Sequence, residues 1–254
     1  MKIKEVLDRR GDLSTFVIHL TKDKGDISAL NNLVSIFQNL TIEARSPMGI
    51  AKDMDDEFNP QFRSQRVVCF TETPLEHIYS FFAQLEEKRN CEFKPYGIGL
   101  TKIQARNLNV NPVWYIDKTP GTIWLHNPEN QEPHAPLTEL IVDAKKKGNF
   151  HSSAISKVTP YIEPMGTWGT HNREFWWERE WRHVGNFKFQ PYSIAFGLCE
   201  EEQIEPFEKW VHSLYGKAYP KYPILHFIDP RWGLEEIIAR LAGKTRNDIT
   251  PFSP

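Results

Sequence analysis

Two glutamates separated by one residue, Glu178 and Glu180, are the side chains of this sequence best suited to chemistry. They lie in the segment 176–184, whose aromatic and β-branched residues favour a strand. Alternate side chains of a strand point to the same face, so we expect the two carboxylates to lie side by side. Such pairs divide acid and base roles in many enzymes. Because Arg179 and Arg182 are adjacent, the alternative is a ladder of ion pairs on an exposed face.

Two further segments end in polar side chains that can hold a ligand. His19 lies near the end of a predicted strand, 15–20, and Thr21 falls on the same face if that strand continues. Phe70, Thr71 and Glu72 end the strand 66–70 just before a helix, where unpaired backbone N–H groups and a hydroxyl can bind a ligand. The alternatives are a structural histidine and a simple helix cap.

Metal and thiol chemistry have little support in the sequence. His19, Glu72, Glu178 and Glu180 could converge on one ion, but His-Glu-x-x-His, Cys-x-x-Cys and Asp-rich calcium motifs are absent, so we expect no metal. No Gly-x-Ser-x-Gly segment indicates a serine hydrolase. The three cysteines are widely separated and odd in number, which argues against disulfides and is typical of a reducing cytoplasm.

The elements that must position these side chains alternate irregularly along the chain. Hydrophobic periodicity and turn residues predict strands and helices in this order: strand 15–20, helix 27–38, strand 66–70, helix 75–89, strand 96–101, helix 102–107, strand 113–116, helix 137–147, strands 176–184 and 193–198, helix 204–215, strand 224–228 and helix 234–242. Thr73 and Pro74 suit the start of the second helix. This order favours an α+β fold.

Length and composition indicate a soluble globular protein. With 254 residues, 40% of them hydrophobic, the chain can form one domain over 1–254, with a helical insertion around 118–160. A formal charge of −2 gives no overall attraction to nucleic acid. No segment approaches about 18 uninterrupted apolar residues, and the first residues lack a signal-peptide core. We therefore expect a cytoplasmic protein without membrane contact.

Four segments together resemble a known family: Val-Ile-His-Leu-Thr (17–21), Val-Cys-Phe-Thr-Glu-Thr-Pro-Leu (68–75), Tyr-Gly-Ile-Gly-Leu-Thr-Lys (96–102) and Glu-Arg-Glu-Trp-Arg (178–182). In this order they resemble the AbiGi-like family of abortive phage-resistance proteins. More distantly, they resemble the ADP-ribosyltransferase-like superfamily that includes the DarT class. The resemblance covers most of residues 15–185 and implies a split mixed β-sheet core with flanking helices.

The resemblance implies NAD as a substrate and a role for each matching residue. His19 and Thr21 would contact the NAD ribose or amide, Phe70 and Thr71 would form a pocket wall, and Glu180 would be the catalytic carboxylate. A carboxylate at the ribose stabilises the oxocarbenium-like cation that develops as the nicotinamide bond breaks.

Other residues would complete such a site. Glu178 would orient or deprotonate the acceptor, and Phe70 or Tyr96 would stack on the nicotinamide ring. Three arginines, Arg45, Arg63 and Arg66, are candidates for the one that DarT-like enzymes place in the site. Of these, Arg45 is our candidate for binding the cofactor, and Arg63 and Arg66 remain alternatives.

Two functional hypotheses follow. The first is an NAD-dependent ADP-ribosyltransferase in anti-phage defence that modifies a nucleic acid or a protein. The second is a non-catalytic, antitoxin-like regulator that binds a partner protein, because the AbiGi-like family is assigned the antitoxin side of an abortive-infection pair. A cognate toxin or antitoxin is the implied partner. An arginine clamped onto Glu178 and Glu180 would favour the regulator.

Overall fold

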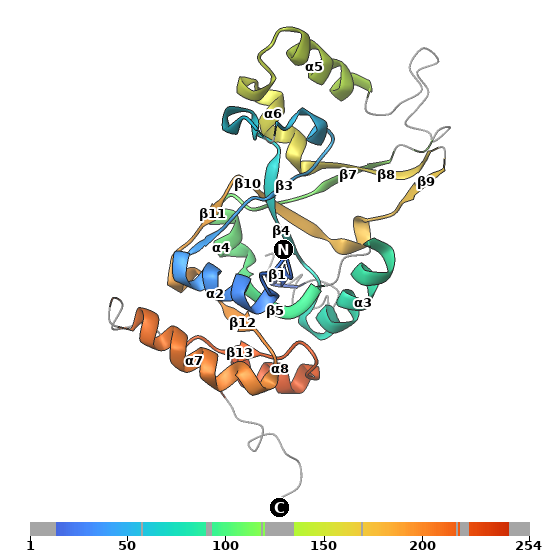
Figure 1. Cartoon of the computed structure of the whole chain (residues 1–254). Helices are drawn as coiled ribbons and strands as arrows, with labels where there is room; N and C mark the ends of the chain where they lie inside the picture. The colour runs from blue at the N-terminus through green and yellow to red at the C-terminus, as the bar shows by residue number, and fades with distance from the viewer. Residues whose placement is uncertain are drawn as a thin grey trace, which may run out of the picture. The chain divides into compact units, whose positions relative to one another are not determined.

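A computed structural model describes residues 14–56, 58–89, 93–117, 119, 135–168, 170–216, 218 and 224–243 (Figure 1). The chain divides into two units. Unit one comprises Met1–Thr41, Phe70–Leu108 and Lys188–Pro254, and unit two comprises Ile42–Cys69 and Asn109–Phe187. The single domain over 1–254 stays a prediction. Of the predicted helical insertion, residues 118 and 120–134 lie outside the described part of the chain.

Unit one is built on a sheet whose strands run in the order β13-β12-β5-β1. These strands are β1 (Phe16–Lys22), β5 (Phe93–Thr101), β12 (Phe196–Leu198) and β13 (Phe227–Ile228). Its helices are α2 (Ala29–Asn39), α3 (Ile78–Arg89), α4 (Lys102–Asn107), α7 (Glu201–Tyr215) and α8 (Leu234–Leu241). β12 and β13 are parallel, whereas β1, β5 and β12 pair antiparallel. Helix α2 packs on β1 and β5, and α7 and α8 both pack on β13 (Figure 1).

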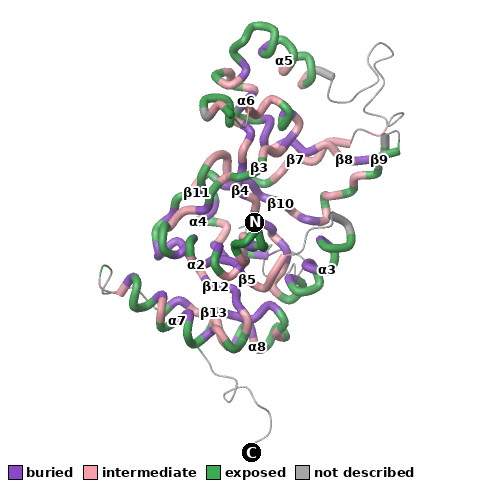
Figure 2. Tube along the Cα trace, viewed as in Figure 1, coloured by how far each residue is buried: buried purple, intermediate pink, exposed green. Residues whose placement is uncertain are grey.

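The core of unit one explains why β1 lacks a clean alternation of buried and exposed residues. Val17, Ile18, Leu20 and Thr21 are all buried. The strands β12 and β13 of the same sheet are also buried (Figure 2). β1 lies between β5 and the end of β4 (Arg66–Thr71), with Ile18 opposite Thr71. Its burial therefore does not alternate as it would in a strand with one face toward solvent.

Unit two contains short strands and two short sheets. It holds β3 (Ser46–Pro47), the first residues of β4, β6 (Asn111–Pro112), β7 (Trp114–Asp117), β8 (Ile162–Trp168), β9 (His171–Arg173) and β10 (Glu180–Val184). β10 lies between β4 and β6, and β7-β8-β9 form a separate sheet. Its helices are α5 (Ala135–Lys146) and α6 (Ala154–Val158). Two short strands, β2 (Thr41–Ile42) and β11 (Phe187–Lys188), lie where the chain passes from one unit to the other.

The predicted strand 176–184 is wrong in its first half. Trp176–Glu178 is a 3-10 helix, Arg179 is left-handed with φ 49°, and β10 begins only at Glu180. Glu178 and Glu180 therefore do not share the face of one strand. A left-handed residue other than glycine is uncommon and reverses the chain direction locally, which strand propensity does not reveal.

Other elements differ from the prediction mainly in their ends. The helix predicted over 75–89 begins as a 3-10 turn, Leu75–His77, and Pro74 rather than Thr73 precedes it. The strands predicted over 193–198 and 224–228 are shorter, as β12 and β13. The α+β class is confirmed. None of the described helices combines the length and the apolar character that a membrane crossing needs.

Candidate functional site

The predicted site residues occur in both units. His19, Thr21, Phe70, Thr71 and Tyr96 belong to unit one, whereas Arg45, Glu178 and Glu180 belong to unit two. The contacts within each unit define what these side chains can do.

Glu180 is part of a buried cluster of charges in unit two. Arg182, two residues further along β10, has no exposed surface. Its Nη2 lies 2.7 Å from Glu180 Oε2 and 2.8 Å from Glu163 Oε2, and its Nη1 donates to the Pro160 carbonyl at 2.7 Å. Both carboxylates are 7% exposed. Two carboxylates therefore share one guanidinium away from solvent, and Glu180 is held by a cation of its own chain.

Burial and the charge of Glu180 shift the pKa values of Arg182 and Tyr115. Burial alone would lower the pKa of Arg182, but the charge of Glu180 and its hydrogen bond outweigh burial and raise that pKa. Burial raises the pKa of Tyr115, and the Glu180 carboxylate raises it further. The Tyr115 hydroxyl oxygen accepts a long hydrogen bond, 3.4 Å, from the Glu180 backbone N–H. Arg182 thus stays charged and Tyr115 stays neutral at physiological pH.

Glu178 and the candidate arginines complete the description of unit two. Glu178 is buried at the end of the 3-10 helix 176–178. Arg45 Nε pairs with Glu43 at 3.1 Å on the surface, and Arg66 Nε pairs with Asp55 at 2.9 Å. Neither ion pair includes a residue of the Glu180 cluster. The arginine that contacts Glu180 is Arg182, which was predicted only as a neutralising neighbour.

In unit one, the structure brings His19 and Phe70 together. Their ring centroids lie 5.7 Å apart at an interplanar angle of 60°. The Thr21 hydroxyl is buried and lies 2.9 Å from the Ala29 carbonyl and 3.2 Å from the Tyr96 carbonyl. It therefore ties β1 to the start of α2 and to β5.

Thr71 takes part in the turn that follows β4. Its Oγ1 accepts the Thr73 backbone N–H at 3.1 Å and lies 2.8 Å from the Thr73 hydroxyl. Glu72 forms an ion pair with Lys102 at 2.6 Å. These contacts stabilise the turn after β4, but they do not form the helix cap that the sequence left open as the alternative, because no side chain caps the 3-10 helix Leu75–His77.

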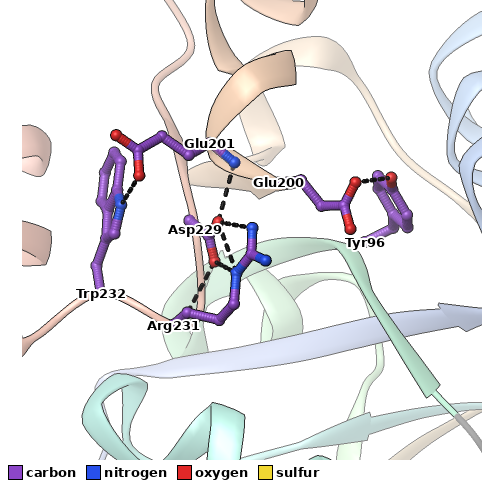
Figure 3. Close-up of polar contacts among 6 residues, drawn as sticks. All are labelled: Tyr96, Glu200, Glu201, Asp229, Arg231 and Trp232. Carbon is purple, nitrogen blue, oxygen red and sulfur yellow. Dashed lines mark hydrogen bonds and ion pairs between the residues drawn. The ribbon is translucent and has the colours of Figure 1, made fainter.

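Tyr96 points toward the start of α7 (Figure 3). Its hydroxyl donates to Glu200 Oε2 at 3.1 Å, and burial together with this hydrogen bond raises the pKa of Tyr96 to about 12. Beside it, Asp229 Oδ2 accepts the Glu201 N–H at 2.9 Å, and Asp229 is paired with Arg231 (Figure 3). Asp229 thereby satisfies one of the unpaired amides of the first turn of α7.

Sequence reasoning missed Glu163, Glu200 and Asp229. Each acts through a partner at least 19 residues away in the chain, Arg182, Tyr96 and Glu201 respectively. No local spacing marks them, because tertiary folding alone makes these contacts. Among the described residues, no group of three His, Cys, Asp or Glu side chains is arranged to hold a metal ion.

Comparisons with known proteins give one result. No curated protein and no solved structure matches the chain. One family model matches residues 36–205, which include all of unit two and the segment 70–108 of unit one, and it is described as "Putative abortive phage resistance protein AbiGi, antitoxin". Since the match covers about two thirds of the sequence, the chain belongs to the AbiGi family.

Proposed function

We propose that this protein is an antitoxin of a phage-defence pair that acts by binding a partner toxin, without NAD chemistry at Glu180. The buried ion cluster carries the proposal. A catalytic carboxylate must face the ribose and offer its charge to the developing cation. Glu180 is 7% exposed, and Arg182 already neutralises it at 2.7 Å. The description of the family, an antitoxin in abortive phage resistance, supports the same conclusion.

The arrangement has a structural purpose that needs no substrate. Arg182 joins β10 to Glu163 of β8 and to the Pro160 carbonyl, so it links segments that meet only in the folded chain. Buried charges that are paired and hydrogen-bonded are tolerated, whereas a single unpaired one is costly. The Glu-x-Glu-Trp-Arg motif can therefore be required for folding rather than for catalysis.

The competing hypothesis, an NAD-dependent ADP-ribosyltransferase, predicts different behaviour. This hypothesis assigns His19 and Phe70 to the NAD site, and their rings lie 5.7 Å apart in unit one. We therefore test NAD chemistry directly. The purified protein is incubated with NAD, and nicotinamide release is measured for the wild type and for Glu180→Gln. We expect no release from either. Release that disappears in Glu180→Gln would overturn the proposal.

Antitoxin function is tested by growth. The toxin partner that this proposal implies is expressed from an inducible promoter together with the wild type, with Glu180→Gln or with an empty vector. We expect the first two to restore growth and to form a complex of defined stoichiometry with the toxin in size-exclusion chromatography. Growth restored only by the wild type, with Glu180→Gln equally folded by circular dichroism, would indicate that the carboxylate itself acts.

A further inference from the structure

A serine and a histidine that no motif in the sequence connects are hydrogen-bonded in unit two. Ser64 Oγ lies 2.8 Å from His151 Nδ1, although 87 residues separate them. Ser64 precedes β4, and His151 lies in the 3-10 helix Phe150–Ser152, after α5. Both residues are partly exposed. A reagent in solution can therefore reach a hydroxyl that already has a base as its neighbour.

The buried amide of Gln65 determines how the serine hydroxyl is oriented. Gln65 Nε2 donates to Ser64 Oγ at 3.0 Å and to the Ser156 carbonyl at 3.1 Å, and its Oε1 accepts from the Thr159 hydroxyl at 2.9 Å. Gln65 and Thr159 have no exposed surface, so this orientation is fixed by the core. Ser64 Oγ accepts from the amide and keeps its own hydrogen to donate, and in the His151 tautomer that carries its hydrogen on Nε2, Nδ1 is the acceptor for it.

Two aromatic rings hold the imidazole in place. The Phe62 ring stacks on His151 with centroids 4.7 Å apart and planes at 29°. The Phe150 ring meets the same imidazole edge-on at 5.2 Å and 85°. A nucleophile within hydrogen-bond distance of a base, with the base oriented by further groups, is the arrangement that activates serine hydroxyls. Here the orienting groups are rings rather than a carboxylate.

We propose that Ser64 and His151 form a nucleophilic site that accepts the acyl group of activated carboxylic esters. Ser64 Oγ attacks the ester carbonyl carbon, and His151 Nδ1 takes the hydroxyl proton. The bond from carbon to the leaving oxygen then breaks, and His151 returns the proton to that oxygen. Water attacks the acyl-serine in the same way and releases the carboxylic acid. The 40% exposed Phe62 ring beside the imidazole favours esters with an aromatic leaving group. The site rests on contacts within unit two alone and is independent of toxin binding.

The test uses two probes, 4-nitrophenyl acetate and a fluorophosphonate. The fluorophosphonate forms an Oγ–P bond and releases fluoride, so it labels an activated serine permanently. We expect one adduct on the full-length wild-type protein by intact mass, and peptide mapping places it on Ser64. His151→Asn should lower the labelling rate on the order of 100-fold or more, which is the usual contribution of a general base.

Ser152→Ala is the matched control. Ser152 follows His151 directly, but its exposed hydroxyl donates to the Asn149 carbonyl at 3.0 Å rather than to an imidazole nitrogen. Its removal should leave both the adduct and the rate of nitrophenol release unchanged. The mapping needs only the wild-type protein, so the folding of a variant does not decide it. Absence of an adduct, an adduct on another residue, or equal labelling of His151→Asn would overturn the proposal.

Discussion

Replacing Arg182 by methionine tests the central feature of unit two. Methionine keeps an unbranched apolar stem but removes the guanidinium, so Glu180 and Glu163 remain buried without their counter-charge. The hydrogen bond to the Pro160 carbonyl is lost as well. Removal of one partner from a buried ion pair costs about 3–5 kcal/mol, because the remaining charge stays desolvated. Since Arg182 has no exposed surface and its two partners are 7% exposed, we expect the full range to apply.

The assay is urea unfolding followed by tryptophan fluorescence. With an m-value of about 3 kcal/mol per molar urea, a loss of 3–5 kcal/mol lowers the midpoint by about 1 to 1.7 M. Glu180→Gln should cost about 1–3 kcal/mol, since the amide oxygen still accepts from Arg182 but the charge is gone. Arg182→Met combined with Glu180→Gln should be more stable than Arg182→Met alone, because the double variant removes one of the two stranded charges.

The matched control is Arg45→Met. Arg45 also pairs with a glutamate, Glu43, at 3.1 Å, but the two side chains are 41% and 64% exposed. Exposed pairs contribute about 0–1 kcal/mol, so this variant should unfold close to the wild type. If Arg182→Met were also within about 1 kcal/mol of the wild type, the argument from burial would be refuted.

Three further predictions concern unit one. Gly99→Ala should lower the free energy of unfolding by about 1–3 kcal/mol, because the added Cβ would lie 2.2 Å from the Phe196 ring. As a control, Gly233→Ser should leave the thermal midpoint unchanged or slightly raised, because no heavy atom lies within 4 Å of a Cβ at that position. The pKa of folded Tyr96 is raised to about 12, so its contribution to stability is present below about pH 10 and is lost as the pH rises from about 10 to 12. The pKa of Tyr115 is raised as well, so absorbance at 295 nm should show one late-titrating tyrosine fewer in Tyr96→Phe than in the wild type. Burial raises the pKa of Asp229, but its hydrogen bonds to Arg231 and Glu201 outweigh burial and lower the pKa. The Asp229 carboxylate therefore stabilises the fold above about pH 4, and this stabilisation is lost as the pH falls through the folded pKa. Asp229→Asn should flatten the acid side of a plot of stability against pH, and an unchanged plot would contradict the capping of α7.

The sequence predicted those elements whose signals are local. The helix over 102–107 is found with the same bounds as α4, because the Thr101 side chain accepts the Gln104 N–H and starts the helix there. Glycines inside a strand commonly mark a close approach by a backbone or a ligand, and β5 contains two, Gly97 and Gly99. At Gly97 the approaching group is the His19 carbonyl, and at Gly99 it is the Phe196 ring. The pattern indicated the need for space, but only the fold identifies the neighbour.

The site was less predictable because its decisive features are not local. The left-handed Arg179 breaks the predicted strand between Glu178 and Glu180, and no propensity scale marks such a residue. Glu163 meets Arg182 from another strand, 19 residues away, so the sequence could show one carboxylate near the arginine but not two. Sequence reasoning therefore singled out the Glu-x-Glu-Trp-Arg motif but predicted a more open environment for it.

The same variants also separate the two functions of the Glu-x-Glu-Trp-Arg motif. If Glu180 is catalytic, Glu180→Gln abolishes activity while the protein stays folded, so activity and stability do not correlate. If the motif is structural, toxin neutralisation follows the free energy of unfolding across Glu180→Gln, Arg182→Met and the double variant, because only the folded protein binds the toxin. Arg182→Met should then be the least active of the three, although it leaves both glutamates in place. The structural role predicts that the double variant neutralises the toxin better than Arg182→Met does, because it removes a stranded buried charge. An enzyme that needs the Glu180 carboxylate would not recover in this way, because the double variant lacks that carboxylate.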